Sequence, residues 1–578
     1  MPPKKAAAAS AASSKPSRAG TKRKAEEPVA PTVAKKAKAT TRAVKTPTTA
    51  ATKETAPAKK ATTKKAAAPK QTKSAASRKP AAATKTQSTA AAIKKSASPA
   101  EKKQPASRRR KAETEVTSTQ PTKKVKPLEK GPVINEPPTA ALNVYVFGEG
   151  SSGELGLGTA KNGIDVKRPR LNANLAADKA GVVKIVAGGM HCLALTQDNK
   201  ILSWGVNDQG ALGRDTTWEG GLRDMDAEED SDSESGDDNG INPKECTPEA
   251  VDFSQTELAE GMRFADIAAG DSCSFAVTDD GRVYGWGTFR KGDGIFGFTS
   301  PGNVVTRPVL LPDLKKITSI ATGSNHALAL DSTGAVWAWG AGEQMQLGRR
   351  IIARTQAEGL IPRQFGLPKG PKNGISQIAS GSDHSFAISK NGAVYSWGSN
   401  NFGETGVADG AGEDNAAVTN PTIVASLNGK VITTIAAGTH HTIAATEAGE
   451  CLVWGRVDSA QSGIEMDDIA KLPDDAIIRD PNKGEPRIII LPQPVAEIEG
   501  DVSAVAAAGD QCIAVTKEGK AWSWGFSSNY QTGQGTDEDV EVATLMDNTA
   551  IRGKKITGAE CGGQFGMLTE RVLLANGV

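Results

Sequence analysis

The chain has 578 residues, 38% of them hydrophobic, and a formal net charge of +4. This small value hides two oppositely charged parts, because residues 1–130 hold 34 Lys and Arg against 7 Glu and no Asp, a net charge of +27, and the remainder carries −23. No apolar run approaches the ~18 residues of a membrane span, and no apolar segment follows the first lysines, so we expect neither membrane association nor a secretory signal.

The first 130 residues are rich in Ala, Lys, Thr, Ser and Pro and contain no Phe, Trp or Tyr. Such a composition buries too little apolar surface to offset chain entropy, so we expect a disordered tail. Its basic clusters predict sequence-independent binding to nucleic acid phosphates, and the first two are spaced as in a nuclear import signal, although a chance pairing in a lysine-rich tail is the alternative. The clusters are Lys22, Arg23 and Lys24; Lys35, Lys36 and Lys38; and Arg108, Arg109, Arg110 and Lys111.

The rest of the chain is built from repeats. Six copies share a glycine, an alternating apolar run, a turn and a Trp-Gly pair, which follows the glycine by 16 residues, or 15 in the last copy. In the copy that starts at Gly381, the apolar run is His384, Phe386 and Ile388. Alternation with a period of two, followed by a glycine or asparagine turn, predicts a β-hairpin in each copy. The Trp-Gly pairs begin at Trp204, Trp286, Trp339, Trp397, Trp454 and Trp524, and the turns are at Asn199, Gly281, Gly334, Gly392, Gly449 and Gly519.

Two half-copies lie at the ends of this region. The segment from Val144, VYVFGEGSSGELGLG, has only the second half, with Phe147 in the tryptophan position, and the segment from Gly562 has only the first half. Together they make a seventh repeat, and a ring closed by its own termini requires such a pairing. The predicted fold is therefore all-β: a seven-bladed β-propeller over residues 140–578, closed by N- and C-terminal strands and preceded by the disordered tail.

Two intervals between Trp-Gly pairs are longer than the others. The first contains residues 224–238, an acidic loop with nine carboxylates, which is either a solvated spacer or a segment that contacts the basic tail or histones. The second contains residues 456–492, for which the sequence indicates no chemistry. The six cysteines show no metal-ligand spacing, and four lie in predicted strands, so we expect them to be reduced and structural. No metal cluster, phosphate-binding loop or nucleophile motif favours an enzyme, and no cofactor is predicted.

The repeats resemble the regulator of chromosome condensation family, in segments such as GGMHCLALT, ALGRDT and AGDSCSFAVTDDGRVYGWG, over essentially all of residues 142–578. The resemblance implies guanine nucleotide exchange on the small GTPase Ran by a chromatin-bound regulator, not a covalent catalyst, in support of nucleocytoplasmic transport and mitosis. The implied partners are a Ran-like GTPase, nucleosomal histones and DNA, and a nuclear import receptor; the implied location is chromatin in the nucleus. The alternative is a chromatin-binding propeller adaptor without exchange activity, because the propeller alone does not determine function.

The resemblance also assigns site residues. The segment Thr288–Gly297, TFRKGDGIFG, is longer than its counterparts and is similar to a wedge that family members push against the GTPase, a role that would fall to Phe289, Arg290, Lys291, Gly292, Asp293 and Gly294. The same resemblance places His191, Asp271, Asn325, Arg349 and His441 on the GTPase face, and Arg354 and Arg363 among the chromatin contacts. From the residues alone, each histidine could instead tie its blade to a neighbouring backbone group, and the arginines could belong to a solvated loop. Asn325 stands where an acid is expected, and Phe565 stands where the split repeat would have histidine.

Overall fold

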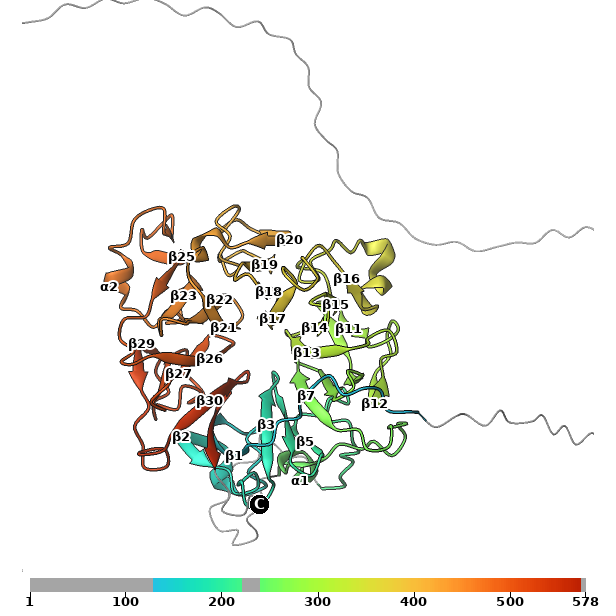
Figure 1. Cartoon of the computed structure of the whole chain (residues 1–578). Coiled ribbons are helices and arrows are strands. Elements are labelled where there is room, and N and C mark those ends of the chain that lie inside the picture. Colours follow the sequence, from blue (N-terminus) through green and yellow to red (C-terminus); the bar gives the residue numbers. More distant parts are fainter. Residues whose placement is uncertain (1–127, 221–239, 573–578) are drawn as a thin grey trace, which may run out of the picture. The chain divides into compact units, whose positions relative to one another are not determined.

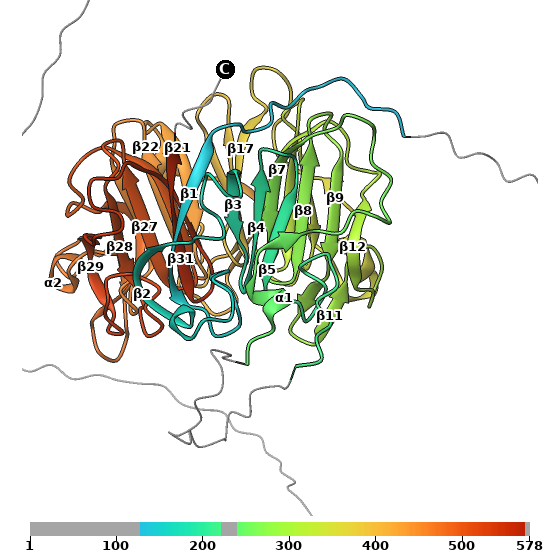
Figure 2. The ribbon, with the colours of Figure 1, turned by 90° about the horizontal axis from the view of Figure 1, so that it is seen from below.

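The computed structural model describes residues 128–220 and 240–572. Residues 1–127, 221–239 and 573–578 lie outside the described residues, and with them the predicted disorder of the tail, its basic clusters and the acidic loop. In the described part, seven sheets are arranged around a central channel, seen along the channel in Figure 1 and from the side in Figure 2. The predicted seven-bladed propeller is confirmed.

Each blade is an antiparallel sheet whose first strand lines the channel and whose last strand lies at the rim. Blade 1 has β3 (Val182–Ala187), β4 (His191–Thr196), β5 (Ile201–Gly205) and β6 (Glu249–Ala250); blade 2 has β7 (Phe264–Ala269), β8 (Cys273–Thr278), β9 (Val283–Gly287) and β12 (Val305–Leu310); blade 3 has β13 (Ile317–Thr322), β14 (His326–Asp331), β15 (Val336–Gly340) and β16 (Arg363–Gln364). Blade 4 has β17 (Ile375–Ser380), β18 (His384–Ser389), β19 (Val394–Ser399) and β20 (Ala417–Ile423); blade 5 has β21 (Ile432–Ala437), β22 (His441–Thr446), β23 (Cys451–Arg456), β25 (Pro486–Pro494) and β24 (Ile477–Arg479); blade 6 has β26 (Val502–Ala508), β27 (Gln511–Thr516), β28 (Ala521–Gly525) and β29 (Val540–Leu545).

Blade 7 is the closing blade. Its strands are β30 (Ile556–Cys561), β31 (Phe565–Val572), β1 (Ala141–Glu149) and β2 (Asp165–Leu171), so that β31 from one end of the chain pairs with β1 from the other. Phe147 is fully buried and packs against Gly533 of blade 6, as Trp204 packs against Gly156 of blade 7. Phe147 therefore occupies the tryptophan position of the seventh repeat, as predicted.

The short helices all lie in loops between strands. They are η1 (Lys161–Gly163), α1 (Pro243–Cys246), η2 (Ala353–Leu360), η3 (Ala425–Leu427) and α2 (Met466–Ile469). The insertion 456–492 contributes β24, α2 and part of β25, and its residues Ile469, Ile477 and Ile489 are buried in the same apolar cluster as Trp454. We conclude that the insertion widens blade 5 by a fifth strand. None of the helices in the described ranges is long and apolar enough to cross a membrane.

The antiparallel order gives the ring two faces. The wedge face carries the turns between first and second strands and the loops between third and fourth strands; the hairpin-turn face carries the turns between second and third strands and the connections between blades. On the wedge face, backbone hydrogen bonds link neighbouring blades in one rotational direction around the channel mouth. The donor and acceptor pairs are Gly563 N to Gly189 O, Gly189 N to Gly270 O, Asp271 N to Ser324 O, Ser324 N to Ser382 O, Ser382 N to Gly438 O and Thr439 N to Gly509 O.

Residues 128–140 form a strap across the hairpin-turn face before the chain enters β1. Ile134 N and Asn135 N both donate to the carbonyl of Asp279 in blade 2, and Asn135 Nδ2 donates to the carbonyls of Thr278 and Ile317 at 2.9 and 2.8 Å. The strap runs from blade 2 past blade 1 to blade 7, as Figure 2 shows above the strands. Residues 128–140 therefore pack on the ring, which the repeat pattern did not indicate, because a strap without secondary structure carries no repeat.

Candidate partner-binding site on the wedge face

The wedge segment forms its own hairpin on the wedge face. Strands β10 (Phe289–Lys291) and β11 (Gly294–Gly297) pair antiparallel, with Arg290 opposite Ile295 and Lys291 opposite Gly294. Gly294 has φ +114°, which L side chains rarely adopt, so glycine is required at this bend. A Cβ at Gly292 or at Gly294 would meet no atom within 4 Å, and Asp293 is exposed, so the tip projects beyond the body of the ring.

The hairpin replaces a different structure found in the other blades. In blades 1, 3, 4, 5 and 7, the loop between the third and fourth strands offers a backbone carbonyl to the indole Nε1 of the next blade, at 2.7 to 3.0 Å. At the seam between blades 2 and 3, aromatic rings take this place: Trp339 packs edge-on against Phe275 of β8 at 5.5 Å between ring centroids, and Gly340 lies against Phe289 of the wedge. The wedge is therefore part of the core at its base.

Three phenylalanines make this base. Phe289, Phe296 and Phe298 are at most 7% exposed; Phe298 stacks on Phe275 and on Phe289, each at 5.7 Å between ring centroids. The side chain of Phe289 is fully buried and offers no surface to a partner, so we do not assign the predicted contact with the GTPase to this side chain. Phe289 anchors the hairpin, while the side chains of Arg290, Asp293 and Ile295 reach solvent.

The repeated histidines are buried between blades. Each Nε2 lies within hydrogen-bond distance of the next blade: His191 of Ser274 Oγ at 2.8 Å, His326 of Ser385 Oγ at 2.7 Å, His384 of Thr442 Oγ1 at 2.9 Å and His441 of Cys512 Sγ at 3.0 Å. Burial lowers the pKa of His191, His384 and His441 to about 4 and that of His326 to about 3, so the rings are neutral at pH 7.

These positions contradict a direct GTPase contact by His191 and His441, whose residues are 1% and 0% exposed. The structure agrees with the alternative interpretation, in which each histidine links its blade to the neighbouring blade. The partners are side chains, whereas the sequence suggested backbone groups. In blade 6 the equivalent residue is Gln511, whose Nε2 donates to the carbonyls of Gly562 and Phe565. Phe565 itself is fully buried, so its substitution for histidine changes the blade interface and not the exposed face.

Asp271 and Asn325 both lie on the wedge face. Asp271 is exposed at the channel mouth, in the β7–β8 turn of the blade that carries the wedge, and lines a cavity of about 230 Å³ with the glycine turns of the other blades. Asn325 is half-buried, and its Oδ1 accepts a hydrogen bond of 2.7 Å from Arg290 N in the wedge. Asn325 therefore holds the wedge from blade 3, which its sequence position did not indicate.

The arginines after the third Trp-Gly pair divide into two kinds. Arg349 is half-buried, and its Nη2 donates to the carbonyls of Ala338, Glu358 and Ile361 at 3.2 to 3.3 Å, so it fixes the loop that contains η2. Its contact with the GTPase stays a prediction. Arg354 and Arg363 are exposed, as a chromatin contact requires.

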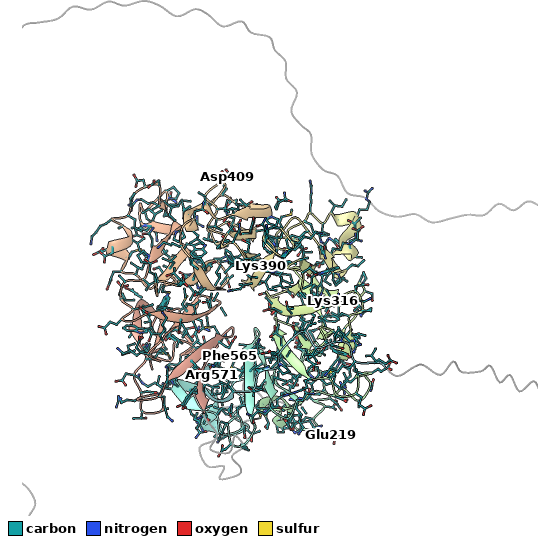
Figure 3. The ribbon with its side chains drawn as sticks, viewed as in Figure 1. Glu219, Lys316, Lys390, Asp409, Phe565 and Arg571 are labelled. Carbon is teal, nitrogen blue, oxygen red and sulfur yellow. The ribbon has the colours of Figure 1, made fainter. Side chains whose placement is uncertain are left out.

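The hairpin-turn face carries exposed lysines that no sequence pattern indicated. Lys315 and Lys316 precede β13, Lys372 precedes β17, and Lys390 lies in the β18–β19 turn; all four are exposed. The segments that carry them are joined, because Ser332 N donates to Lys316 O within blade 3, Lys390 N donates to Gly374 O within blade 4, and Ile375 N of blade 4 donates to Gly334 O of blade 3. Figure 3 labels Lys316 and Lys390 on adjacent blades. The sequence shows that these lysines lie in loops, but it does not show that the loops lie on the same face of the ring.

The described residues show no metal-binding group and no exposed thiol. They contain no group of three or more His, Cys, Asp or Glu side chains placed to hold a metal ion. All six cysteines are buried, in agreement with the structural role predicted for them. What the wedge face offers is a protruding, firmly rooted hairpin beside a ring of polar turns, which suits binding to another macromolecule.

Comparison with known proteins gives consistent matches. Residues 143–568 match the family described as RCC1-like domain. The guanine nucleotide exchange factor SRM1 of Saccharomyces cerevisiae is 40% identical over 73% of this chain and 86% of its own, and protein pim1 of Schizosaccharomyces pombe is 39% identical over 75% and 76%. The crystal structure of Prp20p from S. cerevisiae has a TM-score of 0.67 and 36% identity, covering 77% of this chain and 94% of its own.

Proposed function

Because the chain belongs to the RCC1 family, we propose that it is a guanine nucleotide exchange factor for a Ran-type small GTPase and acts on chromatin in the nucleus. The observation that carries the proposal is the wedge hairpin, with a base in the core and a tip in solvent. The SRM1 relative is named as such a factor, and Prp20p has binding properties described for Gsp1p and histones.

The wedge would act by differential binding. An exchange factor must bind the nucleotide-free GTPase more tightly than either loaded form, and acceleration by about five decades requires roughly 7 kcal/mol of such preference. A hairpin whose base packs among buried aromatic rings can press on the phosphate-binding loop of the GTPase without yielding. Asp271, on the same face, supplies a charge-assisted contact at the channel mouth. The factor accelerates exchange in both directions, so direction comes from the excess of GTP over GDP in the cell.

Chromatin binding would use other surfaces. The exposed Arg354 and Arg363 suit an acidic histone surface, and the basic clusters of the tail together with Lys316 and Lys390 suit DNA phosphates. We propose the same division of the chain as the sequence suggests: a tail for nuclear import and nucleic-acid binding, and a propeller for exchange. A Kap60-bound structure of yeast RCC1 supports the import part of this proposal.

Release of a fluorescent GDP analogue from Ran tests the exchange function. Replacing Lys291–Gly294 by a minimal turn should remove most of the acceleration, while the melting temperature stays near the parental value because the aromatic base is retained. The matched control shortens the β18–β19 turn at Lys390 on the opposite face, which should leave release unchanged. Parental release from the wedge variant would refute the mechanism and favour an adaptor without exchange activity.

Nucleosome and duplex binding tests the tail. Deleting residues 1–127 should leave GDP release nearly unchanged and weaken DNA binding, and the binding that is lost should fall steeply with salt, because counterion release drives it. Two unrelated duplexes of equal length should compete equally. A marked preference for one duplex would show a base-reading element and contradict the proposal.

A further inference from the structure

Lys291 lies in the wedge, yet its side chain is only 8% exposed, whereas that of Asp293 is 77% exposed. The Lys291 ammonium lies 5.2 Å from the centre of the Phe296 ring and 3.2 Å from Oε1 of Gln356, a residue of η2 in blade 3. It also lies 3.3 Å from a carboxylate oxygen of Asp293 and 3.9 Å from one of Glu343. The side chain thus points back toward blade 3 and away from a partner on the wedge face.

Blade 3 holds the wedge at two further points. Gly292 N donates to Glu343 Oε2 at 3.4 Å, and Arg290 N donates to Asn325 Oδ1 at 2.7 Å. Three different segments of blade 3 therefore reach the hairpin: the turn before β14, the loop after β15, and η2. On the side where a Cβ atom would stand, Gly292 and Gly294 meet no atom within 4 Å.

These contacts matter because the wedge strands are short. A two-stranded hairpin is marginally stable by itself, and the aromatic base fixes only the end nearest the core. The direction of the tip then depends on what braces it from the side. A tip that bends on contact loses the differential binding that an exchange factor needs, and small displacements of an acting group reduce rates strongly.

We propose that Gln356 and Glu343 are positioning residues for the wedge, which hold its tip at the working angle through Lys291 and the backbone of Gly292. The proposal rests on the exchange function proposed above. It removes Lys291 from the set of direct contacts with the GTPase and assigns η2, a segment in the loop of exposed arginines, a role in exchange.

The test is GDP release from Ran at varied exchange-factor and GTPase concentrations, with Gln356→Ala and Glu343→Ala. Each substitution should lower kcat by about three- to tenfold, the effect of one polar contact, while KM for the GTPase changes by less than about twofold. In a Lys291→Met background, Gln356→Ala should have no further effect. Glu343→Lys should restore part of the kcat lost by Lys291→Glu.

Matched controls are Gln364→Ala on β16 of the same blade and Glu413→Ala in the corresponding loop of blade 4, which should leave kcat unchanged. Amide hydrogen exchange of residues 289–297 should speed up in the Gln356 and Glu343 variants and not in the controls. Unchanged kcat, an effect that adds fully to that of Lys291→Met, or a rise in KM alone would overturn the positioning role. If the unsubstituted protein does not accelerate GDP release from Ran, the proposed exchange function is refuted instead. Failure of the positioning role and failure of the exchange function are therefore distinguishable.

Discussion

His191 illustrates how single residues join the blades. Its Nε2 donates to Ser274 Oγ, which donates to the carbonyl of Ala211, and the same carbonyl accepts from Trp286 Nε1. The folded-state pKa of His191 is about 4 against an ordinary value of 6.5, so the stability that the neutral ring contributes is present above pH 6.5 and is lost as pH falls toward 4. The residue therefore serves the seam between blades 1 and 2.

Substitution of this histidine should affect stability before activity. His191→Ala leaves a cavity and removes the hydrogen bond that Ser274 Oγ accepts, and we expect a loss of about 2–4 kcal/mol in the free energy of unfolding. GDP release measured well below the melting temperature should stay near the parental rate. A slow but fully stable His191 variant would contradict the buried role.

Asp271→Ala should instead affect activity and not stability, with about ten- to a hundredfold slower GDP release and no change in the melting temperature.

Glu154 offers a test of pH dependence that the repeats themselves suggest. Its Oε2 accepts from Ser152 N, and Gln346 accepts from Gln344 N in the same way in blade 3. Burial raises the pKa of Glu154 to about 7 from 4.5, so the folded state binds its proton more tightly than the unfolded state does. By linkage, this carboxyl costs stability as pH rises from about 4.5 to about 7.

We therefore expect Glu154→Gln to melt higher than the parent at pH 8, by an amount worth about 1–2 kcal/mol, and to lose this advantage near pH 5. Thermal unfolding followed by circular dichroism at several pH values measures the difference. A difference that does not vary with pH would show that Glu154 titrates normally in the folded protein.

At the scale of elements, the wedge hairpin is defined by its aromatic base. In blade 1, for example, the corresponding loop accepts a hydrogen bond from the tryptophan of the next blade through a backbone carbonyl. The blade 2 loop instead inserts Phe289, Phe296 and Phe298 into the seam with blade 3. The same seam buries Leu360 at the end of η2, so the wedge, the base and η2 pack as one unit. Substitutions in the aromatic base should therefore lower both the stability of the propeller and the rate of nucleotide exchange.

Phe298→Ala should cost about 3–5 kcal/mol of unfolding free energy, because the side chain is 2% exposed and stacks on two rings. It should also slow GDP release at temperatures where the protein remains folded, since the hairpin loses its support. Phe298→Leu, which keeps most of the volume, should recover both properties in part. Full exchange activity in the alanine variant would mean that the tip does not depend on its base.

At the scale of the whole molecule, the strap and the closing blade both connect distant parts of the chain. Asn135 is 9% exposed and bridges blades 2 and 3, and Lys130 forms an ion pair of 2.6 Å with Asp279. The strap thus spans several blades before β1 completes blade 7. We infer that it stiffens the ring against opening at its seams.

A chain that starts at residue 128 should therefore be more stable than one that starts at residue 141. The shorter chain leaves buried carbonyls of Thr278 and Ile317 without Asn135 Nδ2, and we expect a loss of about 2–4 kcal/mol. Thermal melting of the two truncations measures this, and Asn135→Ala in the longer chain should reproduce part of the loss. Equal melting temperatures would show that the strap contributes nothing to the ring.

The repeats and the split seventh repeat were sufficient to predict the propeller and its closure by Phe147, because strand alternation and repeat spacing are local properties of a sequence. The unusual length of Thr288–Gly297 marked this loop as different from its counterparts, and only the family resemblance suggested the role of a wedge. The partners of His191, the burial of Phe289, the brace around Lys291 and the strap at Asn135 were decided only by the tertiary structure. Each depends on a contact between residues of different blades, and no local pattern specifies which way a side chain points once the ring has closed.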